Sequence, residues 1–525
     1  MNILSERFPS NYEDDDQKNP AINLYGRRFY TGQPHLEYLA EFLLVFASAK
    51  SSYKQDQFRF AVHSSPESKA TYYPKDRVAL KLFAFFSTSK LATRHPIHRS
   101  VYQDILEKIK FNTSGNISDT EKNDILRLLQ SLFSGFVGIS KNRTWVTCSF
   151  LPAASDLLAR EITWNHPKAL NNSNIKDWDD SRSFFDRSTH NFYGRGGELL
   201  FLQLANLFSQ ETLPLAHNQS KEYAHLAHIS KTDLRDSIEK NLKYVLTDSI
   251  SKINKIVRFI EKSLSEYTFN PEDKETRLGW VPACTLPESQ LFAYEINNIC
   301  QSNTDSLEKI NLLQILCIMQ VLRSLCFQAV RIDESVTITK GFIGNYAWLT
   351  SNPEAKSGDP SRKLSERSVS LIESMLYRVM RSEKLSKYYK NRNQEKIQKA
   401  IKNGDEHCFK HFRKSSKEIG IVIPRTGAGA RFVLPPHLLR FLVAALLAPG
   451  ERIRLTKFYE RVFAHYGIAL GDIQIATAMA WNGNHTDRHN YAVATDTTWI
   501  EETLQQGGLL VELSDAVSIV HNPGS

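Results

Sequence analysis

The feature that most constrains the fold is a long segment, 305–330, whose apolar residues surround the whole circumference of a predicted helix. It opens with Asp305 and Glu308 three residues later, a pattern that caps helix N-termini. A helix that is apolar all round must be covered by other elements on every side. Polar residues such as Gln314 and Arg323 interrupt the run too often for an unassisted membrane span. We therefore expect a buried helix at the centre of a core.

The chain is too long for one core to organise. With 525 residues we expect two to four domains, and a hydrophobic fraction of 41% with 23% charged residues is ordinary for a soluble protein. Helical periodicity dominates, so the predicted class is mainly α and multidomain, with helical N-terminal and central domains and an α+β C-terminal domain. The predicted segments are a polar tail (1–25), an N-terminal helical domain (26–165), a central helical domain (166–350), a hinge with a basic helical segment (351–420) and a C-terminal domain (421–525).

The cysteines and the N-terminus bear on the compartment. The six cysteines contain no CxxC pair and no regular framework, which favours reduced thiols. The first residues are polar and acidic and lack the apolar core of a signal peptide. We expect a cytoplasmic protein.

The positive charge of the chain is confined to one stretch. Residues 378–417 hold thirteen Lys or Arg against four acids, which equals the net charge of +9 of the whole chain. A local excess of cations beside aromatic residues is typical of a surface that binds a polyanion. The predicted nucleic-acid-binding residues are Arg378, Arg381, Lys384, Lys387, Lys390, Arg392, Lys396, Lys399, Lys402, Lys410, Arg413, Lys414 and Lys417.

The spacing within this basic tract suggests how it contacts phosphates. A helix is predicted from Ser365 to about Ser386, and cations recur every three residues from Arg378 to Lys390, so they wind around a helix instead of forming one stripe. If six to eight of them met phosphates of duplex DNA, log affinity would fall against log salt with a slope of about −5 to −7. Two other interpretations stay open: a solvated helical face or connector, and an acidic partner or anionic membrane. The tract lacks the continuous apolar face that membrane-surface helices need, so we expect no membrane contact.

The last part of the chain carries a recognisable order of elements. Residues 421–424 and 431–434 flank a Gly-rich turn and predict a hairpin, and three helical stretches follow between 435 and 481. The string WIEETLQQGGLLVELSDAVSIVHNP then predicts a helix, a Gly-Gly stop and two strands. This order of helices closing in a small hairpin resembles winged-helix domains, over roughly the final ninety residues.

The resemblance implies a helix that enters the major groove of DNA, but the residues argue differently. The matching helix carries Glu501 and Glu502, and the two strands contain no Lys or Arg. Acids there would repel phosphates, so contact with a protein partner is at least as well supported as contact with DNA. A large chain with a winged-helix-like end and no enzymatic signature also resembles accessory subunits of multi-gene bacterial anti-phage systems, which implies membership of a protein complex.

A second candidate site lies in the string FDRSTHNFYGRGGE, where a Gly-rich turn opens a helix. Backbone amides at such a start bind phosphate or carboxylate groups. The candidate phosphate-binding residues are Arg187, His190, Arg195, Gly196 and Gly197. A structural turn is the alternative, and the sequence has no GxxxxGK[ST] motif of the kind that P-loop ATPases use.

Motifs for catalysis or metal binding are weak. The groups His407, Cys408, His411 and His485, Asp487, His489 have helical spacing but no evident complete ligand set, so we assign no metal site. No GxSxG elbow occurs, no cofactor motif is found, and the acids around Asp177 do not form the carboxylate and lysine pattern of a nuclease.

These observations favour a non-enzymatic subunit that binds nucleic acid, with DNA as the first choice, through the basic tract, and other protein subunits through its C-terminal end. A metal-dependent nuclease that uses the region from Asp177 to Glu198 is the first alternative. A protein scaffold without nucleic-acid contact is the second.

Overall fold

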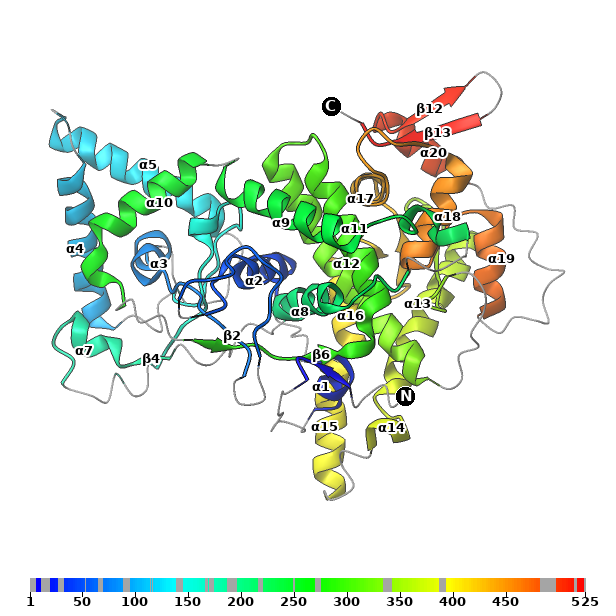
Figure 1. Ribbon diagram of the computed structural model, residues 1–525, viewed down its shortest axis with the longest axis horizontal. Helices are drawn as coiled ribbons and strands as arrows, with labels where there is room; N and C mark the ends of the chain where they lie inside the picture. Colours follow the sequence, from blue (N-terminus) through cyan, green and yellow to red (C-terminus); the bar gives the residue numbers. More distant parts are fainter. Residues whose placement is uncertain are drawn as a thin grey trace. The chain divides into compact units, whose positions relative to one another are not determined.

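Helices make up most of the computed structural model (Figure 1), which confirms the mainly α, multidomain class predicted from the sequence. The structure describes residues 6–10, 19–26, 33–51, 53–64, 69–87, 95–113, 115, 117–137, 145–165, 169, 174–186, 196–215, 221–248, 251–269, 275–333, 342–386, 393–481, 497–513 and 517–523.

The chain forms two compact units, each assembled from separate stretches. Unit 1 contains Met1–Thr31, Leu199–Asn241 and Gly279–Ser525, and unit 2 contains Gly32–Glu198 and Leu242–Leu278. The predicted segments follow one another along the chain, whereas these units are discontinuous. Helices α8 (Gly196–Ser209) and α9 (Lys231–Thr247) run across the division.

Unit 2 is built from helices with three short strand pairings. Its helices are α2 (His35–Ala47), α3 (Val78–Phe85), α4 (Pro96–Asn112), α5 (Asp119–Val137), η1 (Ser155–Leu157), α7 (Trp178–Arg182), α10 (Ser251–Ser263) and η3 (Ser265–Tyr267). Strand β2 (Thr71–Tyr72) pairs with β5 (Thr276–Arg277), β3 (Thr163–Trp164) pairs with β4 (Phe185–Asp186), and an isolated bridge joins Ala49 to Tyr73; all are antiparallel.

Aromatic residues fill the centre of unit 2. His98 is fully buried, and its ring centroid lies 4.4 Å from that of Trp164 and 5.2 Å from that of Trp145. Phe185 packs against the same tryptophans. Aromatic edge-to-face packing of this kind holds the short strands to helix α4 without a large sheet.

Unit 1 contains most of the remaining elements. Its helices are α1 (Pro20–Tyr25), η2 (Lys221–Leu226), η4 (Ala283–Thr285), α11 (Leu286–Gln301), α12 (Ser306–Ile332), α13 (Pro360–Val379), α14 (Glu383–Ser386), α15 (Gln394–Glu406), α16 (Phe409–Glu418), α17 (Pro436–Leu446), α18 (Leu455–Tyr466), α19 (Asp472–Trp481) and α20 (Thr498–Gln506). Its strands are β1 (Arg7–Phe8), β6 (Val281–Pro282), β7 (Trp348–Ser351), β8 (Val422–Ile423), β9 (Arg431–Val433), β10 (Arg452–Arg454), β11 (Ile468–Ala469), β12 (Leu510–Leu513) and β13 (Val517–His521).

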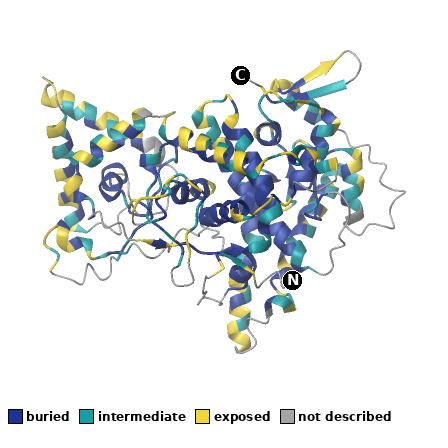
Figure 2. Cartoon of the chain, viewed as in Figure 1, coloured by how far each residue is buried: buried dark blue, intermediate teal, exposed yellow. Residues whose placement is uncertain are grey.

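Helix α12 is the buried central helix that the sequence predicted. The Asp305 carboxylate accepts hydrogen bonds from the amides of Leu307, at 2.9 Å, and Glu308, at 3.1 Å. Helices α1, α11, α13, α16 and α17 all pack against it. In the described part of the chain α12 alone is long and apolar enough to cross a membrane, and 89% of its apolar window is buried inside the protein (Figure 2).

Two sheets lie on this helical core. The first has the strand order β11-β7-β9-β8, in which β7 runs parallel to β11 and β9 while β8 and β9 form the predicted hairpin. The indole of Trp348 in β7 stacks on the ring of Phe432 in β9 at 5.3 Å. Residues 348–351 therefore join the predicted C-terminal hairpin in one sheet, so this hairpin is not independent of the preceding chain.

The second sheet closes the chain. Strands β12 and β13 form the predicted antiparallel hairpin, and β10 adds to the other side of β13, which gives the order β10-β13-β12. Helix α17 packs against α18 and α20, while α18 packs on β10 and β13. Three helices therefore pack together beside a three-stranded sheet.

Candidate nucleic-acid interface

Helix α13 begins as its sequence dictates but ends earlier than predicted. The Asp359 carboxylate accepts a hydrogen bond from the Ser361 amide at 2.8 Å, and Pro360 occupies the first helical position. The helix ends at Val379, and the short α14 is a separate element. The predicted single helix from Ser365 to about Ser386 is thus wrong in its last part, and Arg381 and Lys384 do not continue the spiral of α13.

A tertiary ion pair fixes the chain where α13 ends. The guanidinium of Arg381 donates to both carboxylate oxygens of Asp405 in α15 at 2.8 Å, and to the carbonyl of Tyr377 at 2.9 Å. It also lies over the ring of Tyr377, 3.3 Å from its centroid. The hydrogen bonds that Arg381 donates to the Asp405 carboxylate raise the pKa of this guanidinium. This side chain therefore ties α13 to α15 and faces an acid of its own chain.

The other arginines of the tract that the structure describes are paired in the same way. Arg378 donates to the Asp333 carboxylate at 2.7 Å, and Arg413 in α16 forms a two-point pair with Glu373 in α13. Asp333 and Glu373 lie outside residues 378–417, so a charge count within the tract misses them. Bidentate arginine–carboxylate pairs hold two elements in a defined geometry.

The lysines of the tract divide into two groups. Lys410 pairs with Glu406, Lys414 lies 3.7 Å from Glu418, and the ammonium group of Lys384 is 3.5 Å from a backbone carbonyl. The described residues supply no carboxylate partner for the remaining lysines: Lys396, Lys399, Lys402 and Lys417. Lys417 is half-buried, and the other three are exposed on α15.

Helix α15 is anchored at one end and exposed at the other (Figure 2). Ala400, Gly404 and Asp405 are buried, and a Cβ atom on Gly404 would lie only 2.6 Å from Cγ of Pro20 in α1. In contrast, residues 393–399 are exposed except for Ile397, which is half-buried. The first two turns thus carry Lys396 and Lys399 without a packed face.

The candidate phosphate-binding turn has a different structural role where it is described. Arg187, His190 and Arg195 lie outside the described residues, as do Lys387, Lys390 and Arg392 of the basic tract. Gly197 donates its amide to the Glu41 carboxylate of α2 at 2.8 Å. A Cβ atom on Gly196 would lie 2.0 Å from the ring of Tyr38, and one on Gly197 would lie 2.4 Å from the Tyr38 carbonyl. The glycines let α8 begin in close contact with α2, and the Gly197 amide already donates its hydrogen bond to the Glu41 carboxylate.

Candidate metal and nuclease residues take structural positions. Burial lowers the pKa of His411 to about 3, and Cys408 lies 3.2 Å from the hydroxyl of Tyr25. The Asp177 carboxylate caps α7, because it accepts a hydrogen bond from the Asp180 amide at 2.9 Å. Among the residues that the structure describes, no group of three or more His, Cys, Asp or Glu side chains is arranged to hold a metal ion. The group around His485 lies outside that part of the chain.

Polar side chains on α12 form a buried network that the sequence analysis did not predict. Arg323 pairs through both terminal nitrogens with Glu295 of α11, at 2.7 and 2.8 Å, and all these side-chain atoms are inaccessible to solvent. His465 Nδ1 lies 2.7 Å from Glu295, and its Nε2 lies 2.8 Å from Nε2 of His225. The signal was available, because an arginine inside an otherwise apolar helix requires a buried partner.

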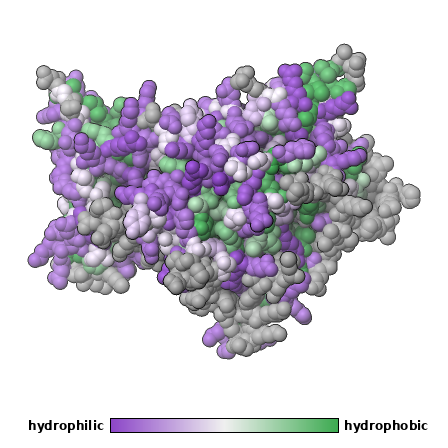
Figure 3. All heavy atoms as spheres, viewed as in Figure 1, coloured by the Kyte–Doolittle hydropathy of each residue, from purple (hydrophilic) through white to green (hydrophobic). Residues whose placement is uncertain are grey.

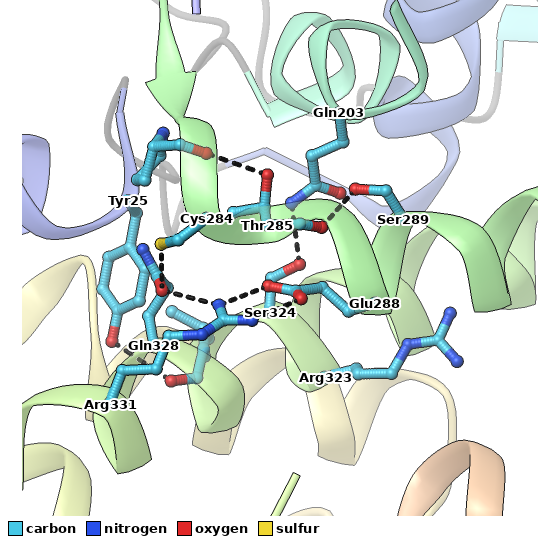
Figure 4. Close-up of polar contacts among 12 residues, drawn as sticks. Tyr25, Gln203, Cys284, Thr285, Glu288, Ser289, Arg323, Ser324, Gln328 and Arg331 are labelled. Carbon is cyan, nitrogen blue, oxygen red and sulfur yellow. Dashed lines mark hydrogen bonds and ion pairs between the residues drawn. The ribbon is translucent and has the colours of Figure 1, made fainter. Parts of the chain in front are cut away.

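A second polar cluster lies toward the end of α12 (Figure 4). Arg331 forms a two-point pair with Glu288 at 2.6 Å and donates to the Gln328 side-chain carbonyl at 2.7 Å. The Cys284 thiol donates to the same carbonyl at 3.5 Å, and burial raises the pKa of this thiol. A raised thiol pKa disfavours the nucleophilic thiolate, so the arrangement serves packing and orientation.

No family model matches the sequence, and no curated protein or solved structure matches it significantly.

Proposed function

We propose that this protein is a non-enzymatic nucleic-acid-binding subunit of a multiprotein complex, and that it contacts phosphates through the exposed lysines of α15. The observation that carries the proposal is the contrast within the basic tract. Its described arginines are committed to carboxylates, whereas Lys396, Lys399 and Lys402 are exposed and lack a carboxylate partner among the described residues. Lys387, Lys390 and Arg392, which precede α15 in the chain, add to the same positive region in sequence.

The number of exposed lysines sets the size of the expected effect. Three phosphate contacts on duplex DNA give a slope of log affinity against log salt of about −2.7. This slope is about half of the slope expected for the whole tract, because only the three exposed lysines of α15 are counted. Lysine ammonium groups contact phosphates as point charges, so no sequence preference is expected from them.

The test measures binding to labelled duplex DNA by fluorescence anisotropy at a series of salt concentrations. The triple variant Lys396→Glu, Lys399→Glu, Lys402→Glu should lose most of its affinity and flatten the slope by about 3. A matched control changes three exposed lysines of α9 and α10 to Glu (Lys240, Lys252 and Lys255), with the same change in net charge. Equal losses in both variants would contradict a specific role for α15. Parallel titrations with single-stranded DNA and RNA identify the preferred nucleic acid.

The C-terminal helices and the β10-β13-β12 sheet are proposed as a winged-helix-like module that contacts protein. Val511 and Leu513 on β12 are 48% and 52% exposed, and Figure 3 shows hydrophobic atoms over this hairpin. Helix α20 and strands β12 and β13 contain no Lys or Arg, and the cations of this sheet, Arg452 and Arg454, lie on β10, on the other side of β13 from β12. Exposed apolar residues on a hairpin without cations favour a protein partner over a phosphate backbone there.

Membership of a bacterial anti-phage complex in the cytoplasm follows from the resemblance described above and is part of the proposal. Co-expression with the products of neighbouring genes tests it, since a stable complex should be lost in the double variant Val511→Asp, Leu513→Asp. Retention of the complex by that variant would place the contact elsewhere. A plasmid-cleavage assay with Mg²⁺ or Mn²⁺ distinguishes the nuclease alternative, which requires cleavage that Asp186→Ala abolishes.

A further inference from the structure

Unit 2 contains a cavity that no part of the proposed function uses. It has a volume of about 310 Å³ and is lined by the end of α2, the loop that follows it, the chain before α3, η1, the end of α9 and α10. Small-molecule sites span roughly 300–1,000 Å³, so this cavity lies at the lower end of that range and suits one compact small molecule.

The cavity has more cations than carboxylates. Its lining includes Lys54, Lys75, Arg77 and Arg258 but only one acid, Asp156. The Asp156 carboxylate serves two guanidinium groups at once, because one oxygen accepts from Arg77 at 2.9 Å and the other from Arg258 at 2.8 Å. Even with Glu261, which also pairs with Arg77, and with Lys75 left out of the count, three cations (Lys54, Arg77 and Arg258) stand against two carboxylates. The excess favours an anionic ligand.

Arg77 is a nearly buried lining residue whose guanidinium is incompletely hydrogen-bonded. It is 8% exposed, and its Nε has no hydrogen-bond partner among the residues that the structure describes. Buried donors normally have a partner, and an incompletely bonded guanidinium beside a cavity indicates a group that a ligand can complement.

Backbone strain is concentrated at the same place. Five non-glycine residues in the described part of the chain have a positive φ, and three of them line the cavity: Lys54 at 57°, Phe58 at 57° and Arg77 at 53°. A fourth, Asp56 at 55°, lies between the first two. Non-glycine residues in this region are rare and cluster at ligand-binding sites, where strain directs a side chain. Two independent features, charge and strain, thus mark one cavity.

The remaining lining residues indicate the rest of the ligand. Phe58 and Tyr73 contribute aromatic rings, and Ser48, Ser155 and Thr247 contribute hydroxyl groups. The hydroxyls of Ser48 and Thr247 already donate to backbone carbonyls of their own helices, so they are left to act as acceptors. Aromatic side chains pack against flat rings, and hydroxyls bond to polar substituents. We infer that this cavity binds a small phosphorylated ligand with an aromatic ring, of the size of a nucleoside monophosphate.

Isothermal titration calorimetry on the full chain tests this inference with AMP, GMP, CMP and UMP as probes. At least one of them should bind, while the corresponding nucleoside and inorganic phosphate should each bind at least about tenfold more weakly, since each lacks one set of contacts. No binding by any of the four at about 1 mM would overturn the inference. Equal affinity for inorganic phosphate alone would also overturn it, because the rings would then contribute nothing.

Variants locate the binding to the cavity. Lys54→Ala and Arg258→Ala change exposed side chains, so both proteins should fold and each should bind at least about tenfold more weakly. Lys252→Ala, at another exposed position of α10, is the matched control and should bind normally. Arg77→Lys tests the buried guanidinium while it keeps the charge.

The α15 triple variant should bind the nucleotide normally, which separates this site from the proposed nucleic-acid interface. Unchanged affinity in both Lys54→Ala and Arg258→Ala would refute the assignment.

Discussion

The arginines at the α13–α16 junction and the lysines of α15 belong to one basic tract but have different environments. Arg381 and Arg413 each form a two-point pair with a carboxylate, whereas Lys396 and Lys399 lie on exposed turns. A planar guanidinium matches a carboxylate in geometry, while a lysine ammonium is a strongly hydrated point charge. A high density of cations in a sequence therefore overstates the charge that is available to a partner, and the proportion of arginine indicates how much of it is used internally.

The largest expected effect concerns a fully buried cation. Arg323→Met leaves Glu295 as a buried carboxylate without its cationic partner, beside Nδ1 of His465, and breaking such a pair costs about 3–5 kcal/mol in the free energy of unfolding. Chemical denaturation followed by circular dichroism measures it. Arg127→Met, at an exposed position of α5, is the control and should cost less than about 0.5 kcal/mol. A small loss for Arg323→Met would mean that water reaches this site.

The buried histidines should make the free energy of unfolding depend on pH. Burial lowers the pKa of His225 to about 2 and that of His411 to about 3, and it also lowers the pKa of His465. Below the unfolded pKa of about 6.5 the unfolded chain binds protons that the folded chain excludes, so stability is complete above that pH and falls as pH decreases. Each histidine contributes up to about 1.4 kcal/mol per pH unit between pH 6 and 4.

Denaturation midpoints between pH 7.5 and 5 give this slope. His225→Asn should reduce it by the contribution of one group. A wild-type stability that is constant over this range would contradict the buried neutral state.

The arginine pairs at the junction should have an intermediate effect. Arg381→Ala removes a partly exposed pair with Asp405, and we expect a loss of about 1 kcal/mol in the free energy of unfolding. Its affinity for DNA should remain close to that of the wild type, because this guanidinium already faces an acid. A loss of affinity as large as that of the α15 triple variant would remove the distinction between the two groups of cations.

The smallest effect on stability is expected from the lysines themselves. Replacing Lys396, Lys399 and Lys402 with Ala should change the free energy of unfolding by less than about 0.5 kcal/mol per site, because exposed side chains without partners contribute little. Thermal and chemical unfolding of the triple variant measure this. Substantial destabilisation would show that α15 packs against a surface through these residues.

Local signals in the sequence were enough for some elements. The β12–β13 hairpin followed from two short apolar stretches after a Gly-Gly stop, and α12 followed from its apolar circumference and the Asp305 cap. Both depend on residues that are neighbours in the chain. Pairing between β7 and β9 could not be predicted in this way, since parallel strands join positions about eighty residues apart.

The candidate site depended on long-range partners, which is why its prediction was only partial. Asp333 and Glu373 pair with tract arginines 45 and 40 positions away in the chain. The glycines that open α8 were interpreted as a phosphate turn because the sequence does not reveal that Tyr38 packs against them. Charge counts and glycine patterns identify residues under constraint, but the nature of the constraint depends on what the fold brings near them.

The contact between the rings of His225 and His465 fixes which nitrogen of each ring carries its hydrogen. Glu295 can only accept, so neutral His465 must carry its hydrogen on Nδ1, and its bare Nε2 then requires the hydrogen on Nε2 of His225. The tautomer of a ring near the surface is in this way dictated by a carboxylate two hydrogen bonds away. Replacing that acid with an amide would release both rings from a single proton arrangement, which NMR of the imidazole nitrogens would detect.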